Sequence, residues 1–411
     1  MRGSSLALAS IVVVAGAARA DAGVIDWFVD LFQSKPKPVM RRATFTITYS
    51  VDPDDDGEIN GRFAARGIRV GAYTHENLFG AASIDAAAET DANGRVSFVY
   101  PVRPGEKVTF RFETDGRNAS TYPGKSNFWE TPHRGKLELS VADSQKDVKR
   151  ALFWTGRMND AIGVQAAATH ARAYGERILG SDYRDKVDYE FPCTDPKGED
   201  KDISHTSSPS HVSVAEPAWG RAHHTIFHET GHTFYLKARG RLRELLRKIF
   251  DHSSKSAHSF TTRMGDPRRA LSEGMANFFM VFAKDEFGRL RGRSDLVTAQ
   301  SLGWCGEYHA GRDHPDVEFV VWGNDTEVNV GNGLHDLVDL EEDDLGIVAG
   351  FPDRSHLATE EAGIKAVFDS VEQHPGYSRP DVGQLWRNVL RKKFGAAGED
   401  ALRMNGCDPL R

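Results

Sequence analysis

The stretch "AHHTIFHETGHTFYL" runs from Ala222 to Leu236 and places histidines and a glutamate inside an apolar segment. Within it, His228, Glu229 and His232 form the pattern H-E-x-x-H. On a helix, positions i and i+4 lie on one face, one turn apart. Two neutral imidazoles in that arrangement can both reach one zinc ion, at about 2.0–2.1 Å. The stretch therefore predicts a helix that its apolar residues anchor in a core and that carries a metal-binding face.

A second segment, "GDPRRALSEGMANFFMVF", offers the third protein ligand that a catalytic zinc site normally has. Asp266 followed by Pro267 suits the N-cap and first position of a helix, so a second helix is expected to begin there. Glu273 would carry a carboxylate on this helix, packed against the first. Asn277 lies one turn later on the same face, where its side chain can hydrogen-bond the free edge of a ligand imidazole.

The H-E-T-G-H pattern that begins at His228 and the S-E-G-M-A-N pattern around Glu273 resemble the gluzincin group of zinc metallopeptidases. This resemblance implies that His228, His232 and Glu273 hold a zinc ion and that Glu229 is the general base. Asn277 stands where the thermolysin-like branch has an aspartate, so its role is inferred from its position. The resemblance also implies a protein or peptide substrate.

The residue that would stabilise an oxyanion is less well defined by the sequence. His335, in "GNGLHDLVD", is the first candidate, followed by Tyr308 and His309 in "CGEYHAG". Tyr235 lies seven residues after His228, on the same helical face, and is a further candidate or a core residue. His224 is one turn before His228, and we expect it at the start of the helix rather than on the metal.

Short alternating runs between residues 43 and 144, such as "TFTITYSV" and "KVTFRFET", predict β-strands separated by turns. Asn93-Gly94 is a typical hairpin turn. The passage "TDANGRVSFVYPVRPGEKVTFRF" resembles transthyretin-like or Ig-like modules, which implies a β-sandwich over 43–144. The predicted fold class is therefore α+β multidomain, with this sandwich followed by a mainly helical, zincin-like domain with a small sheet over 145–411.

The second region is expected to begin with an alanine-rich helix, "MNDAIGVQAAATHARAYGERILG", which ends at Gly180. "KVDYEF" and "SHVSVA" are predicted strands. The second of these has the alternation of a half-buried edge strand. In gluzincins such an edge pairs with extended substrate backbone, so we expect "SHVSVA" to do the same.

The N-terminal residues have the features of an export signal. Residues 1–20 combine Arg2, an apolar run and a small-x-small site, which predicts a signal peptide cleaved near Ala20 and a secreted or periplasmic protein. Residues 21–42 are expected to form a linker. Three cysteines are present, which permits one disulfide without choosing its pair.

An acidic turn, "DPDDDGEINGRF", matches the early positions of an EF-hand calcium loop with Asp52, Asp54 and Asp56. Its twelfth position holds Phe63 rather than glutamate. A solvated turn is therefore favoured over a Ca²⁺ site.

The composition limits the possible functions. Hydrophobic residues make up 39% and charged residues 27% of the 411 residues, and the formal net charge is -7. A negative charge argues against a general affinity for nucleic acid, and no segment after the signal is long and apolar enough for membrane insertion. Two kinds of function stay open: a secreted zinc endopeptidase, or a zinc-binding surface or adhesion protein that has lost catalysis. A zinc hydrolase of a non-peptide bond is a third possibility, and the presence of Glu229 favours an enzyme. Oligomeric state is left open.

Overall fold

The structure is a computed structural model. It describes residues 36–50, 62–74, 86–124, 132–193, 204–215, 223–240, 264–290, 324, 326–338, 359–375, 380–404, 406–408 and 410. The expected signal peptide, most of the expected linker, the acidic turn at 51–61, Cys305, Tyr308 and His309 lie outside the described residues.

Two four-stranded sheets occupy the N-terminal region. Their strands are β1 (Val39–Ser50), β2 (Arg62–Ala64), β3 (Arg69–Tyr73), β4 (Ala86–Glu89), β5 (Arg95–Val102), β6 (Thr109–Glu113), β8 (Arg134–Glu138) and β9 (Val148–Phe153). The first sheet has the order β2-β1-β5, with β9 paired in parallel to β1, and the second has the order β4-β3-β6-β8. Every pairing between neighbours other than β1 and β9 is antiparallel.

The two sheets share an apolar core, as the alternating pattern predicts. Alternate residues of β1 are buried, and Phe45 meets the rings of Phe110 and Phe112 from β6 at 4.9 and 5.2 Å, edge to face. Regular structure begins at Val39, inside the segment that we expected to be a linker. It does so because residues 39–42 pair with residues 99–102 of β5, although their side chains are mostly exposed.

The tight turn at Asn93-Gly94 is present, but it does not form a hairpin. The Gly94 N–H donates to the Asp91 carbonyl at 3.0 Å, and Gly94 has a φ of 67°. The strands on either side belong to different sheets, because β4 pairs with β3 and β5 with β1. The hairpin prediction was therefore wrong: the turn carries the chain from one sheet to the other.

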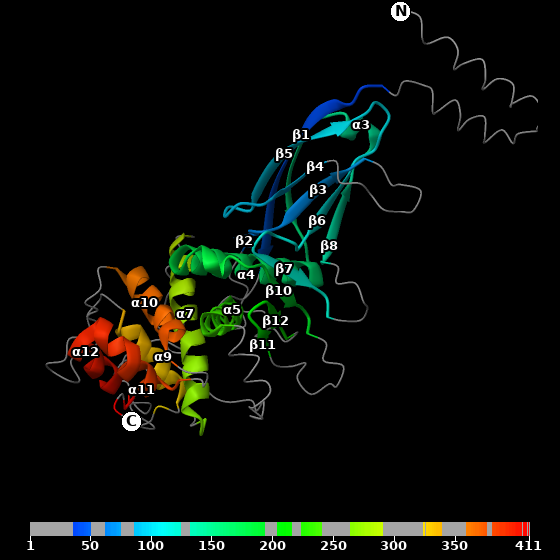
Figure 1. The fold of residues 1–411 in the computed structure, drawn as a ribbon. Helices are drawn as coiled ribbons and strands as arrows, with labels where there is room; N and C mark the ends of the chain where they lie inside the picture. Colours follow the sequence, from blue (N-terminus) through cyan, green and yellow to red (C-terminus); the bar gives the residue numbers. More distant parts are fainter. Residues whose placement is uncertain are drawn as a thin grey trace, which may run out of the picture.

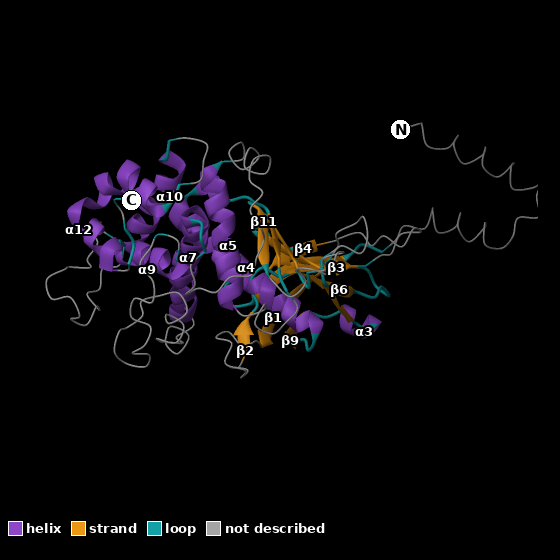
Figure 2. Cartoon of the chain, turned by 90° about the horizontal axis from the view of Figure 1, so that it is seen from below, coloured by secondary structure: helices purple, strands orange, loops and turns teal. Residues whose placement is uncertain are grey.

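A short helix, α3 (Val141–Ser144), lies at the far end of the N-terminal sheets (Figure 1). The other helices form the opposite end of the molecule, and α4 and α5 lie nearest the strands (Figures 1 and 2). They are α4 (Arg157–Leu179), η2 (Ser181–Tyr183), α5 (His223–Arg239), α7 (Pro267–Leu290), α9 (Glu327–Asp336), α10 (Glu360–Gln373), α11 (Val382–Leu385), η5 (Trp386–Leu390) and α12 (Arg391–Met404). The predicted helix that ends at Gly180 is α4. Among the helices that the structure describes, none has both the length and the apolarity needed to cross a bilayer.

A third, small sheet lies beside α5. It contains β7 (Ala119–Tyr122), β10 (Val187–Glu190), β11 (His205–Ser208) and β12 (His211–Ser213), in the order β11-β12-β10-β7. The predicted strands "KVDYEF" and "SHVSVA" correspond to β10 and β12. Because β12 lies between β11 and β10, it is an interior strand of this sheet, and the described edge next to it is β11.

The two regions exchange one strand each. β7 comes from the stretch expected to form the sandwich but pairs in parallel with β10. β9 follows residue 144 but pairs in parallel with β1. The molecule is therefore α+β, with backbone hydrogen bonds that cross the expected boundary at 144/145 in both directions.

Candidate metal centre

Helix α5 is held in the core by its apolar residues, as expected. Ile226, Phe227 and Phe234 are fully buried. Thr230 adds a polar anchor, because its hydroxyl lies 2.7 Å from the Tyr189 hydroxyl of β10. These contacts fix the rotation of the helix and so fix the direction of its histidines.

Helix α7 begins where the sequence predicts. The Asp266 side chain accepts a hydrogen bond from the Arg268 N–H at 3.0 Å, and Pro267 is the first helical residue. The backbones of α5 and α7 touch at Gly231, where an added Cβ would lie 2.9 Å from both Cα and O of Ala276. Glycine at this position therefore allows α7 to bring its side chains onto the histidine face of α5.

Three side chains converge where these helices meet. Oε2 of Glu273 lies 2.9 Å from Nε2 of His232 and 3.3 Å from Nε2 of His228, and the two Nε2 atoms are 3.1 Å apart. The ligand atoms of a tetrahedral zinc ion with bonds near 2.05 Å lie about 3.3 Å apart. The donor triangle thus has the size of one face of such a tetrahedron. The three side chains keep 11–15% of their surface exposed, so a fourth position can face solvent.

The hydrogen bonds behind His228 select the imidazole form that binds a metal. Its Nδ1–H donates to Oδ1 of Asn277 at 2.6 Å, as expected from the position of Asn277. The Asn277 amide in turn donates from Nδ2 to Oε1 of Glu327 at 2.7 Å. Because Glu327 accepts, the amide must present its oxygen to His228, which leaves the Nε2 lone pair for a cation.

Glu327 was not found from the sequence. It is fully buried and is the first residue of α9. This helix packs on α7 but comes much later in the sequence. Its only sequence signal is an acidic residue at a helix start, which usually has a solvent-exposed capping role. Glu327 became identifiable as part of the centre only through the packing of α9 against α7.

Without a metal, the convergence of these groups perturbs their proton affinities. Burial alone would lower the pKa of His228, but its hydrogen bond to Glu273 and the nearby carboxylates raise it to about 9. Burial works against the charged form of Glu273, yet His232 and His228 hold the pKa of that carboxyl well below its usual range. A negative cluster that draws a proton onto His228 is equally suited to a divalent cation.

Glu229 lies beside the cluster and is oriented by the small sheet. It is buried, and the Thr206 hydroxyl lies 2.8 Å from both its Oε2 and its backbone oxygen. Thr206 belongs to β11, so the described edge strand contacts the residue expected to be the general base. No pattern in the sequence points to Thr206, because a threonine in a short strand is ordinary.

Of the other candidates, His335, Tyr235 and His224 lie within the described residues, and none of them joins the cluster. His335 stacks on Phe282 with ring centroids 4.9 Å apart. Phe282 follows Glu273 by nine residues on α7, a rise of about 13 Å. Tyr235 is a fully buried residue of α5, and the Arg239 guanidinium lies 6.0 Å from its ring centroid. His224 lies in the first turn of α5, as expected.

No family model, curated protein or solved structure matches this chain. What the centre does must therefore be argued from its own geometry.

Proposed function

We propose that the protein is a zinc-dependent hydrolase that cleaves peptide bonds, with His228, His232 and Glu273 as the metal ligands. One observation carries the proposal: the three donor atoms form a triangle of tetrahedral size directly beside a buried, oriented Glu229. Two neutral imidazoles and one carboxylate are a common ligand set of catalytic zinc. The amide and carboxylate behind His228 complete the kind of support that such ligands require.

Bound zinc would lower the pKa of a water molecule and polarise a substrate carbonyl. The chain's own residues supply the proton transfers. Glu229 accepts the proton of the attacking water on its carboxylate and returns it to the leaving amine. Thr206 fixes the orientation of that carboxylate, because its hydroxyl donates a hydrogen bond to Oε2. Asn277 and Glu327 hold His228 in the Nδ1–H form throughout.

The substrate backbone is proposed to lie along β11. This strand is one of the two described edges of the small sheet, the other being β7, and Thr206 on β11 contacts Glu229. An extended peptide that adds to a sheet edge gains main-chain hydrogen bonds. A peptide bound there would run past Glu229, the proposed general base. β12 is an interior strand, so it has no free edge at which a peptide could add.

The remaining expectations about the whole protein are part of the same proposal. The N-terminal sheets are proposed to form a sandwich of the transthyretin-like or Ig-like kind, joined to a zincin-like region. The N-terminal twenty residues are proposed to direct export. The competing functions are a zinc-binding surface protein without catalysis and a zinc hydrolase of another bond, and the presence of Glu229 beside the cluster favours catalysis.

Cleavage of casein and of a peptide library, with and without a chelator, tests this function. Glu229→Gln should retain zinc by elemental analysis but lose about 10²–10⁴-fold in rate. Glu138→Gln, at an exposed carboxylate of β8, is the matched control and should keep full activity. Retained zinc without cleavage of any peptide by the unmodified protein would instead support one of the two competing functions.

A further inference from the structure

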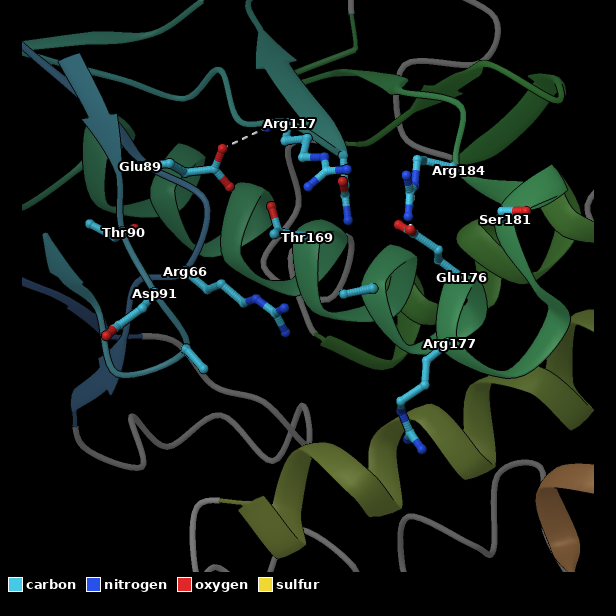
Figure 3. A pocket seen from close by; sticks show the side chains of 13 residues that line it. Arg66, Glu89, Thr90, Asp91, Arg117, Thr169, Glu176, Arg177, Ser181 and Arg184 are labelled. Atoms are coloured by element: carbon cyan, nitrogen blue, oxygen red, sulfur yellow. Dashed lines mark hydrogen bonds and ion pairs between the residues drawn. The ribbon is translucent and has the colours of Figure 1, made fainter.

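A second cavity lies outside the metal centre, where α4 meets the strands of the N-terminal region (Figure 3). Its volume is about 710 Å³. None of the metal-centre residues lines it. Four arginines do, and they come from different parts of the chain: Arg66, Arg117, Arg177 and Arg184.

Two of these arginines already have counter-ions. Arg184 donates from Nε to Oε1 of Glu176 at 2.5 Å. Arg177 pairs with Glu286 at 2.9 Å and also with Glu361. Their charges are therefore largely neutralised by the protein itself, and they form the wall of the cavity beside η2.

The guanidinium groups of Arg66 and Arg117 have no ion-pair or hydrogen-bond partner among the residues that the structure describes. Burial lowers the pKa of the Arg66 guanidinium, while the charges of Glu286, Glu89 and Asp91 oppose that effect. Arg66 is half-buried, so its cation has lost hydration and gained no hydrogen bond in return, whereas Arg117 is exposed. An anionic group that enters the cavity would supply that partner.

Glu89 and Asp91, two carboxylates that line the cavity with these arginines, are engaged with backbone donors. Oε2 of Glu89 accepts the Arg117 N–H at 2.8 Å. Oδ1 of Asp91 accepts the N–H groups of Asn93 and Arg95 at 2.8 and 2.9 Å. These carboxylates shape the turns that carry the arginines and are not ion-paired to the guanidinium groups.

The two arginine-bearing turns are held in fixed positions by one buried side chain of α4. Gln165 is fully buried, and its Nε2 lies 3.1 Å from the Gly67 carbonyl and 2.8 Å from the Ala119 carbonyl. Gly67 has a φ of 79°, and an added Cβ there would lie 2.2 Å from Oγ1 of Thr169. The residues next to Arg66 and close to Arg117 are thus fixed on the same helix before any ligand arrives, which reduces the entropic cost of binding.

A further polar group lines the cavity. Asn118 follows Arg117, and its buried Oδ1 accepts no hydrogen bond from the described residues. A buried acceptor of this kind normally has a partner.

We propose that this cavity is a binding site for a small molecule that carries phosphate or carboxylate groups, for which the unpaired guanidinium groups of Arg66 and Arg117 are the partners. Guanidinium groups suit this chemistry because their planar N–H forks match the oxygens of carboxylate and phosphate. The site adjoins the outer face of α4, whose other side packs on α5, so it lies apart from the metal centre. It does not depend on the proposed hydrolase activity.

Isothermal titration calorimetry of the full chain with inorganic phosphate, and separately with malate, tests the site. At least one of the two anions should bind, with an affinity that falls as salt rises. Arg66→Gln and Arg117→Gln should each weaken binding about tenfold or more. Arg66→Lys, which keeps the charge but not the fork, should restore part of the affinity. Arg150→Gln, at an exposed arginine of β9, is the matched control and should bind as the parent does.

Circular dichroism must show the parent spectrum and melting temperature range for each variant before its affinity is compared. Binding of phosphate alone, malate alone or both identifies the anion that the cavity prefers. The proposal is overturned if neither anion binds at millimolar concentration, or if both glutamine variants bind like the parent. Neither result would affect the cleavage assay, so the two proposals can fail separately.

Discussion

Replacing Gly231 by alanine should separate the two helices that build the metal centre. The new Cβ would lie 2.9 Å from Cα and O of Ala276, whereas non-bonded carbon atoms normally approach to about 3.5–4.0 Å. Because both neighbours are backbone atoms of α7, the helices must move apart by about 0.6–1 Å. Metal–ligand bonds tolerate about 0.2 Å, so Glu273 would leave the reach of an ion held by His228 and His232.

The stability of this variant should change less than its metal affinity. Overpacking costs about 1–3 kcal/mol, and the better helix propensity of alanine returns about 1 kcal/mol. Competition with a chelator should therefore show zinc binding weakened at least about tenfold, while urea unfolding shows a loss of about 0–2 kcal/mol. Gly163→Ala in α4 is the matched control, because its Cβ would meet only the Tyr49 ring at 3.3 Å. Zinc affinity equal to that of the parent in Gly231→Ala would refute the reasoning.

Three further outcomes follow from the contacts around the centre. In a chelator competition, Glu327→Ala should weaken zinc binding about 10–100-fold, because the Asn277 amide loses the acceptor that fixes its orientation. Glu327→Gln keeps an acceptor and should bind zinc nearly normally in the same assay. Thr206→Val should lower kcat about tenfold without loss of zinc, since only the orientation of Glu229 is affected. Recovery of kcat in Thr206→Ser would show that the loss comes from the missing hydroxyl and not from altered packing. Zinc affinity should rise about tenfold per pH unit between about pH 6 and 8. The reason is that the raised pKa of about 9 keeps a proton on His228, which the metal must displace. A zinc affinity that does not change with pH in a competition titration would contradict this.

The local features of the centre could be predicted from the sequence, because they depend on spacing along one helix or at one helix start. The i, i+4 spacing places His228 and His232 on one face, and the Asp266 cap sets the start of α7. Asn277 follows from Glu273 by the same rule. Each of these predictions needed only the helical period and the capping preferences.

The contacts that depend on which elements pack together could not be predicted. Strand alternation shows which side chains are buried but does not identify the partner strand. For this reason the sequence predicts a hairpin at Asn93-Gly94 and an edge strand at β12, whereas the turn joins two sheets and β12 is an interior strand. Glu327 and Thr206 reach the centre from α9 and β11, and neither position has a local pattern that points to it.

The exchange of β7 and β9 has a consequence for dissecting the protein. A cut after residue 144 would strip β9 from β1 and leave a row of unpaired backbone groups along that strand. The same cut would deprive β10 of β7, in the sheet whose far strand touches Glu229. Neither half keeps all of its backbone pairings when expressed alone, so we expect the strand-rich end and the histidine cluster to unfold together.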